Sequence, residues 1–337
     1  MGASAVAVAC ALAAATYLAW LRAEMLRPYR GWVGAGVVVQ VERGWSSRAI
    51  LERLEEAGVI RDAGRVAVYV RIRGDGGALK AGEYGFDQPL SPIDVLERLR
   101  RGEVLLHAIT VPEGLTVEET ARRFADEGLA DAEALIRALG DPTPIRSFDP
   151  QATDLEGYLF PETYRFPRGA EPRDIAQKLV RGFLEAVGES YADEARAVGL
   201  TPRQAVTLAS MIEKETGTDA ERARISRVFH NRIALGMRMQ CDPTVIYALA
   251  RDGRYRGALT SEDLRYSSPW NTYVVAGLPP GPIASAGRAA LTAAVRPAPG
   301  NDLYFVAAPG GGHRFSSSLP EHNRAVGAWR DYVRSSR

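Results

Sequence analysis

The first strong pattern along the chain is an uninterrupted apolar run near its N-terminus. Residues 3–21 read ASAVAVACALAAATYLAWL and contain no charged side chain. A helix needs about 20 apolar residues to cross a bilayer, and Tyr17 and Trp20 suit the interfacial end of such a span. We therefore predict a membrane anchor over residues 1–22, with a cleaved signal peptide as the rival interpretation.

Strand and helix patterns then follow each other twice. The segments VERGWSSRAILERLEEAGVI (41–60) and VPEGLTVEETARRFADEGLA (111–130) match at an offset of 70 residues. Each predicts a strand, a glycine turn, a Ser or Thr at a helix start and a glycine at the helix end. The alternation of Val37, Val39 and Val41 predicts a half-buried strand before the first copy.

Between the two copies, residues 79–86 and 91–104 suggest a further strand and helix. Two similar α+β lobes explain this arrangement, and so does a glycan-binding module. A Pro- and Asp-rich stretch over 140–154 predicts a connector between domains. We expect an α+β chain in four parts, namely the anchor 1–22, a module over 36–107, a second small lobe and connector over 108–150, and a main domain over 151–337.

The main domain shows clear helix signals. Thr201, Pro202 and Gln204 predict an N-cap, a first-turn proline and a capping box for a helix over about 202–217. Asp219 is expected to cap a second helix over 220–237, and Asp242 a third. A hairpin is predicted over 302–316, and a last helix is expected to begin near Glu321.

Composition excludes several classes of function. With 42 basic and 41 acidic residues the net charge is +1, so there is no basic excess that would indicate nucleic-acid binding. The two cysteines, Cys10 and Cys241, form no disulfide framework or Cys-x-x-Cys motif. The four histidines lack metal-ligand spacing; they are His107, His230, His313 and His322. We predict no metal and no cofactor.

Two glutamates stand close together in the segment ASMIEKETG (209–217). At 100° per residue they flank the face formed by Ala205, Leu208, Ala209 and Ile212. Glu215 falls beside Leu208 and Met211, where apolar neighbours would raise the carboxyl pKa, as a general acid requires.

Glu213 has smaller neighbours and is the candidate for an ion pair with Arg224 or Arg232 of the next helix. From spacing alone, Glu215 is favoured as the acid. The alternative is that both glutamates pair with arginines and do no chemistry.

Two further stretches carry groups suited to sugars. LEGYLFPETYRFP (155–167) combines carboxylates with Tyr158, Phe160, Tyr164 and Phe166, although each aromatic ring alone is more typical of a core. SSPWNTYVVAGLPPGPI (267–283) is a rigid Pro- and Gly-rich loop that contains Asn271 and Tyr273.

Five blocks in order now resemble the YceG-like endolytic murein transglycosylase family: LEGYLFPETY, ASMIEKETG, RVFHNRIALGMRMQCDPTVIYAL, NTYVVAGLPPGPI and DLYFVAAPGGGHRFSSSLPEHNRAV. The resemblance runs from about residue 36 to the C-terminus. It implies a single membrane anchor, a LysM-like module and a catalytic domain outside the cytoplasmic membrane. By itself the positive-inside rule favours the opposite orientation, because Arg22, Arg27 and Arg30 follow the anchor and no basic residue precedes it.

The resemblance also implies the chemistry. Family members cleave peptidoglycan glycan strands internally and leave 1,6-anhydro-N-acetylmuramic acid ends, and the second glutamate of the block, here Glu215, is the catalytic one. We expect Gln240, Asn271 and Tyr273 to bind the sugar, with Glu156 and Tyr158 near the same groove. Glu213 and Asp242 complete the expected substrate-binding set. The expected partners are glycan strands and the membrane, with peptidoglycan synthases suggested by the family.

Two alternatives stay open. A hydrolytic muramidase would need a second essential carboxylate, for which Glu213 and Asp242 are the candidates. A non-catalytic glycan-binding scaffold of the elongation or division machinery would need neither.

Overall fold

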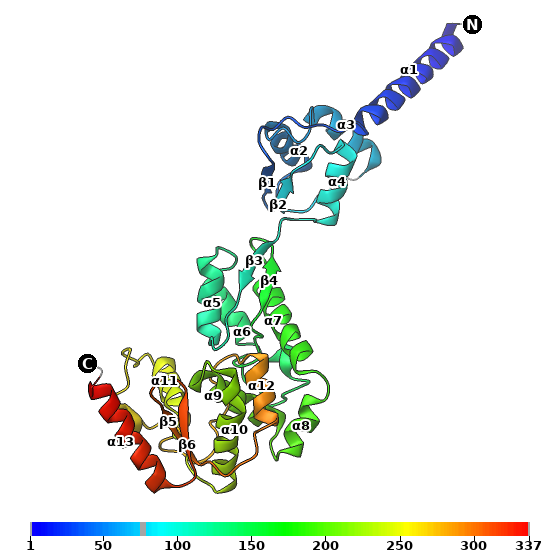
Figure 1. The fold of residues 1–337 in the computed structure, drawn as a ribbon. Helices are drawn as coiled ribbons and strands as arrows, with labels where there is room; N and C mark the ends of the chain where they lie inside the picture. Colours follow the sequence, from blue (N-terminus) through cyan, green and yellow to red (C-terminus); the bar gives the residue numbers. More distant parts are fainter. Residues whose placement is uncertain (1, 75–78, 336–337) are drawn as a thin grey trace. The chain divides into compact units, whose positions relative to one another are not determined.

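The computed structural model describes residues 2–74 and 79–335 and divides into two compact units (Figure 1). The first unit runs to His107 and includes Arg165–Gly169. The second holds Ala108–Tyr164 and the chain from Ala170 onward. The predicted mixed α+β class is confirmed. Residues 1, 75–78 and 336–337 fall within the predicted ranges 1–22, 36–107 and 151–337 and lie outside the described residues.

The N-terminal apolar run forms one helix, α1 (Gly2–Met25), of which Ser4–Met25 is long and apolar enough to cross a membrane. The helix extends beyond the predicted end at residue 22. The reason is that Leu21 and Met25, one turn apart, are both buried in the core of the first unit. Burial of this last turn keeps it helical past the first arginine.

The rest of the first unit is a small α+β module. Its elements are β1 (Val37–Val41), α2 (Ser47–Glu56), α3 (Ala63–Arg73), β2 (Gly82–Phe86) and α4 (Pro92–Arg101). The two strands pair antiparallel, with Val39 opposite Tyr84. Both side chains are fully buried, together with Leu54 and Leu99. The predicted half-buried alternation of the first strand is confirmed.

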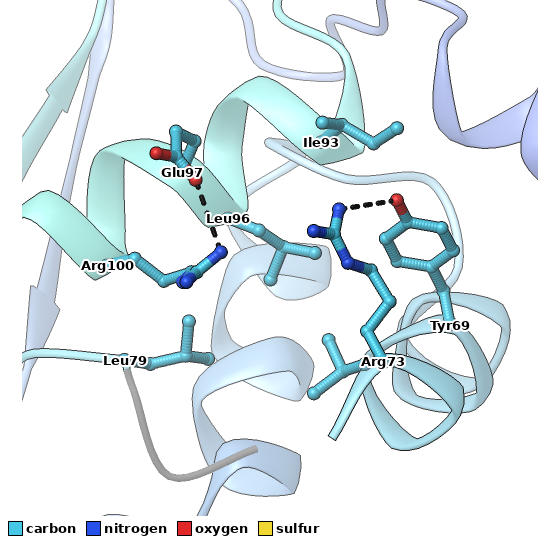
Figure 2. Close-up of a pocket in the computed structure, with 8 residues that line it drawn as sticks. Tyr69, Arg73, Leu79, Ile93, Leu96, Glu97 and Arg100 are labelled. Atoms are coloured by element: carbon cyan, nitrogen blue, oxygen red, sulfur yellow. Dashed lines mark hydrogen bonds and ion pairs between the residues drawn. The ribbon is translucent and has the colours of Figure 1, made fainter. Parts of the chain in front are cut away.

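A small pocket between α3 and α4 bears on the idea of a glycan-binding module (Figure 2). Arg73 donates a hydrogen bond to the Tyr69 hydroxyl at 3.1 Å, and Arg100 pairs with Glu97 at 3.4 Å. The cavity measures about 20 Å³, which is room for about one water molecule. This pocket therefore cannot hold a sugar ring.

The sequence repeat has a structural counterpart. In the first copy, a turn at Gly44 (φ +85°) leads to α2, whose N-cap is Ser46. In the second copy, β3 (His107–Thr110) and a turn at Gly114 (φ +77°) lead to α5 (Val117–Asp126). Thr116 caps α5 with a complete capping box. Each copy therefore is a strand, a left-handed glycine and a capped helix.

The second unit adds helices around this second copy. Its remaining elements are α6 (Ala132–Leu139), η1 (Thr143–Ile145), β4 (Thr163–Phe166, paired with β3), α7 (Pro172–Val187), α8 (Tyr191–Ala197), α9 (Pro202–Glu215), α10 (Asp219–Ala234), α11 (Asp242–Arg251), η2 (Asp263–Arg265), α12 (Arg288–Val295), the antiparallel pair β5 (Tyr304–Ala307) and β6 (His313–Ser316), and α13 (Leu319–Ser335). The predicted hairpin and last helix are confirmed.

Helix α9 is the centre of the second unit. It packs against α8, α10, α11 and α12, and every residue from 205 to 212 is buried. The prediction of a single apolar face was therefore wrong, because neighbours surround this helix on all sides. Its buried Ser210 has partners inside and outside the helix: it donates to the Thr207 carbonyl at 2.7 Å and accepts from the Ile283 amide at 3.0 Å.

The stretch predicted to connect two domains, 140–154, is packed into the second unit instead. Ile145 is fully buried. Asp149 accepts hydrogen bonds from Tyr158 at 2.6 Å and from Arg203 at 2.5 Å. A prediction from Pro and Asp content missed these contacts, since such content does not indicate partners, and Arg203 lies far away in sequence. The finer domain boundary at 150 and 151 remains a prediction.

Gly157 marks a close approach between two of the sequence blocks. It has φ +85°, and a Cβ placed there would lie 2.6 Å from Pro282 Cγ and closer still to Pro282 Cβ. We expect Gly157→Ala to destabilise the second unit by about 2–5 kcal/mol, because left-handed backbone strain and overpacking add. Urea unfolding followed by circular dichroism measures the loss.

Gly199 is the matched control for this prediction. It has φ +82°, and no heavy atom lies within 4 Å of the place that a Cβ would take. Gly199→Ala should cost only the backbone strain, about 1–2 kcal/mol. Equal losses for the two variants would contradict the contact with Pro282.

Candidate active site

Glu215 is the last residue of α9, and its carboxyl lies beside the start of α11. Burial raises the pKa of this carboxyl, and the negative charge of Asp242 acts in the same direction. A hydrogen bond with Cys241 and the charges of His313 and Arg232 oppose the rise without cancelling it. The position in a last helical turn also disfavours an anion, because the helix dipole is negative there. A raised pKa agrees in direction with the sequence prediction.

Glu213 has the opposite environment. Its carboxylate accepts from Arg222 at 3.0 Å and from the Gly287 amide at 3.0 Å, and the Glu213 and Arg222 side chains are only 6% and 5% exposed. The prediction of an ion pair to the next helix is confirmed in kind, but the partner is Arg222. Arg224 and Arg232, the predicted partners, contact Asp302 and backbone carbonyls instead.

These contacts separate the roles of the two glutamates. The expectation that Glu213 binds substrate does not fit the structure, because both of its carboxylate oxygens are used inside the protein. Among the described residues, Glu215 has no ion pair with Lys or Arg. The alternative in which both glutamates pair with arginines therefore holds for Glu213 alone.

The start of α11 is tied to the loop 267–283 through Thr272, a residue that the sequence analysis did not single out. The Cys241 amide donates to the Thr272 hydroxyl at 3.1 Å, and the Thr244 hydroxyl lies 2.9 Å from the same oxygen. All three residues are buried. This contact holds the loop against the helix that faces Glu215.

Asp242 and Tyr273 form a second tie between the same elements, with the Tyr273 hydroxyl donating to Asp242 Oδ1 at 2.6 Å. Asp242 was predicted as the N-cap of α11, and this was wrong. The N-cap position is Cys241, and Asp242 is the first helical residue. Its carboxylate is turned to the tyrosine instead of to the helix amides. The two predicted residues are thus brought together beside Glu215.

Gln240 precedes this helix and is exposed. Its φ is +51°, and no other non-glycine residue of the described chain has a positive φ. Its backbone amide donates to the Thr272 carbonyl at 3.2 Å. Left-handed backbone at a non-glycine residue is uncommon and is concentrated at functional sites. The neighbouring contacts therefore hold Gln240 in a defined and strained position.

Two of the predicted sugar ligands are structural in this conformation. Tyr158 is buried, and its hydroxyl donates to Asp149. Asn271 is fully buried; its amide nitrogen donates to the Leu264 and Tyr266 carbonyls, and its oxygen accepts from the Tyr273 amide at 2.9 Å. Direct sugar contacts from these two side chains therefore do not fit this conformation, since both side chains are hydrogen-bonded inside the protein.

The sequence analysis assigned Arg232 to an ion pair and missed both its backbone contacts and the pairing of His313 with Glu221 near Glu215. Arg232 donates to the Leu303 carbonyl at 2.7 Å and to the Met239 carbonyl at 2.6 Å. His313 donates its amide to Glu221 at 2.8 Å, and its Nδ1 lies 2.8 Å from the same carboxylate. Burial alone would raise the pKa of Glu221, but the bonds and charge of His313 hold it below its ordinary value.

A signal for these residues was present in the helical pattern of α10. Glu221 and Arg232 lie at the two ends of the stripe that contains Ile225 and Val228, with spacings of three and four residues. Charged residues on an apolar stripe are buried and need partners. The pattern therefore identifies them as paired, although it does not identify the partners.

Glu156 lines a separate cavity of about 350 Å³ in the second unit, with Asp154, Ile136, Leu139, Tyr247 and Arg251 among the other lining residues. It accepts from the Val117 amide at 3.2 Å and from the Tyr247 hydroxyl at 3.4 Å. Burial raises the pKa of Glu156 to about 8. Glu215 is not among the lining residues, but α11 contributes to the surroundings of both carboxyls.

The raised pKa of Glu156 has a consequence for stability. Its folded-state pKa lies above its ordinary value of 4.5, so the folded chain binds more protons than the unfolded chain in this range. The contribution of this group to the free energy of unfolding is fully present below its ordinary pKa and is lost as pH rises through about 8. Near neutral pH the carboxyl therefore carries its proton and presents a hydroxyl group.

Comparisons with known proteins place the chain in a family. It matches the YceG-like family over residues 39–328. A Bacillus subtilis (strain 168) protein named endolytic murein transglycosylase is 32% identical over 320 residues, which cover 90% of this chain and 87% of the relative. A Streptococcus pneumoniae serotype 2 (strain D39 / NCTC 7466) protein of the same name is 27% identical, and the match covers 86% of this chain and 58% of that protein.

A solved structure agrees with these sequence matches. The crystal structure of a YceG-like protein from Listeria monocytogenes is 31% identical and covers 86% of this chain and 98% of its own, with a TM-score of 0.58. Because the family match spans most of the sequence and the Bacillus relative aligns along most of both proteins, this chain belongs to the YceG-like family.

Proposed function

We propose that this chain is an endolytic peptidoglycan lytic transglycosylase, as the names of its Bacillus and Streptococcus relatives suggest. The observation that carries the proposal is the environment of Glu215. It is a mostly buried carboxyl with a raised pKa and no arginine or lysine partner among the described residues. Such a group keeps its proton nearer to neutral pH, which a general acid requires.

In the proposed reaction, protonated Glu215 donates its proton to the oxygen of the MurNAc–GlcNAc β-1,4 bond. That bond breaks, and positive charge develops at the muramyl anomeric carbon. The C6 hydroxyl of the same sugar attacks this carbon, and Glu215, now a carboxylate, accepts the hydroxyl proton. The product carries a 1,6-anhydro ring, and Glu215 is returned to its protonated form.

One carboxyl suffices in this scheme because the nucleophile belongs to the substrate. An intramolecular hydroxyl replaces the water and the second carboxylate that a hydrolase needs. Its proximity to the anomeric carbon can lower the activation free energy by up to about 7–11 kcal/mol. No metal or cofactor enters the proposed reaction. Gln240, Asp242 and Tyr273 lie around the start of α11 and are the proposed sugar-binding groups. The cavity at Glu156 is proposed to hold a part of the glycan strand further from the bond that is cleaved.

A hydrolytic muramidase is the second candidate. Glu213 does not fit as its second carboxylate, because Arg222 and the Gly287 amide use both oxygens. Asp242 is placed to act, since its charge reaches Glu215. It is also hydrogen-bonded to Tyr273. The two reactions differ in product, with anhydro ends from the transglycosylase and reducing ends from the hydrolase.

The location of the reaction is also a proposal. Helix α1 fits a single-pass anchor by length and composition. We place the second unit on the extracytoplasmic side of the cytoplasmic membrane, where peptidoglycan lies, and propose peptidoglycan synthases as partners. The module 36–107 is proposed to be LysM-like.

We expect Glu215→Gln to lower the rate of glycan cleavage by at least about a hundredfold, because the amide cannot transfer a proton. Purified peptidoglycan is digested with each protein, and the muropeptides are analysed by mass spectrometry for anhydro and reducing ends. Glu194→Gln, which alters an exposed ion pair with Arg296, should leave the products unchanged. Cleavage at the wild-type rate by a folded Glu215→Gln protein would refute the proposed role of Glu215. Absence of cleavage by the wild-type protein itself would support the non-catalytic scaffold.

The charge of Asp242 provides a test of the pH dependence. This charge raises the pKa of Glu215, and the reaction needs the protonated acid. Activity therefore falls on the alkaline side, as Glu215 loses its proton. Asp242→Asn removes the charge and lowers that pKa, so the alkaline limb of the kcat/KM profile should move to lower pH.

Asp252→Asn is the matched control, because Asp252 accepts from the Tyr266 hydroxyl at the other end of α11. This variant should leave the alkaline limb in place. An alkaline limb that stays fixed in Asp242→Asn would show that the limb does not report Glu215.

A further inference from the structure

The end of α1 is built into the first unit. Leu21 and Met25 are buried in its core, and α1 packs against α3. Figure 1 shows α3 beside the end of α1. The helix therefore continues into the module without a linker, and the module has a defined position relative to the apolar span.

Helix geometry sets the depth of this junction. With a rise of 1.5 Å per residue and a hydrocarbon layer of about 30 Å, a span that starts at Ser4 leaves that layer after roughly 20 residues. That distance brings the chain close to residue 24, at the level of the buried turn. Whatever packs on Leu21 and Met25 then lies in the headgroup layer of the leaflet on the side of the module.

Helix α3 presents a suitable face at this place. Its buried side carries Val66 and Val70. On the exposed side Val68 and Ile72 are 39% and 58% exposed. Arg65 lies three residues before Val68 on the same stripe. Arginine beside exposed aliphatic side chains on one face can meet lipid headgroups while the aliphatic groups meet the acyl chains.

Aromatic and cationic groups mark the same level. The Arg65 guanidinium lies over the ring of Trp20 of α1 at 5.2 Å, and Arg61 lies over Tyr29 at 5.0 Å. Trp20 itself is partly exposed on α1. Tryptophan and tyrosine are enriched where a protein passes from hydrocarbon to headgroups. Arg65 also pairs with Asp62 at 2.9 Å but keeps 42% of its side chain exposed, and Arg61 is exposed, so both can reach lipid phosphates.

We propose that the exposed face of α3, with Arg65, Val68 and Ile72, and the preceding Arg61 rest on the anionic phospholipid headgroups of the membrane that α1 spans. The occupant is a lipid surface because the patch continues the apolar span. The two arginines meet phosphates, while the two aliphatic side chains enter the upper acyl region. This contact orients the module on the membrane, goes beyond the proposed glycan cleavage and requires only that α1 spans.

The test uses the full chain in lipid nanodiscs. The exposed Cys10 is changed to Ala, Cys241 is buried, and an environment-sensitive fluorophore is attached to Ile72→Cys. Val38→Cys on β1 is the matched control, because Val38 is also an exposed aliphatic residue of this module, at 49%. The discs contain phosphatidylcholine with or without phosphatidylglycerol, and a fraction of the lipid carries a doxyl quencher.

In discs with phosphatidylglycerol, we expect the label at position 72 to shift to the blue and to be quenched, and the label at 38 to do neither. The double variant Arg61→Glu with Arg65→Glu should weaken the association of this face with the lipid, and so the quenching at position 72, about fivefold for each arginine replaced. Arg48→Glu with Arg53→Glu, on α2, should leave it unchanged. Circular dichroism confirms that each variant is folded.

A label at position 72 that stays unquenched in discs that contain the protein would overturn the proposal. Equal quenching with neutral lipid and with the reversed arginines would overturn the assignment of the arginines to lipid phosphates. Incorporation into discs reports the span of α1 separately. Glycan digestion by the same samples reports Glu215, so failure of either proposal is distinguishable from failure of the other.

Discussion

The ion pair between Glu213 and Arg222 sets the chemistry at the end of α9. This helix is buried on all sides over residues 205–212, so a carboxyl that follows it must find a cationic partner or keep its proton. Arg222 and the Gly287 amide neutralise and bind Glu213. Glu215, two residues further, has no such partner among the described residues, and burial raises its pKa. One helix end therefore holds an ion-paired carboxylate and a carboxyl with a raised pKa side by side.

The surroundings of Glu215 are held from several elements. Thr272 ties the loop 267–283 to the start of α11, and Arg232 binds the carbonyls of Met239 and Leu303. The position of the strained residue Gln240 follows from these contacts. Because these contacts are buried or partly buried, the groups that face Glu215 are held in place by the protein itself. Preorganisation of this kind is what proton transfer in a fixed geometry requires.

The first unit bears on how the basic residues after α1 are interpreted. By charge alone, Arg22, Arg27 and Arg30 favour a cytoplasmic body. In the structure Arg30 stacks over Trp32, and Arg27 pairs with Glu24 at 2.5 Å. These side chains belong to the folded junction between helix and module, where they have partners of their own. Their number is therefore a weaker indicator of orientation than the same residues would be in an unstructured loop.

The sequence by itself determined the local elements of this protein: the apolar helix, the repeated strand–glycine–helix pattern, the capped start of α9 and the hairpin. These follow from short-range propensities and from periodicity, which consecutive residues carry. The five family blocks also identified Glu215 as the candidate general acid. Only the tertiary structure decided which carboxyl is paired, that Asn271 and Tyr158 are internal supports, and that residues 140–154 are packed. Such outcomes depend on burial and on partners distant in sequence. A pattern of consecutive residues does not tell which distant residues come into contact.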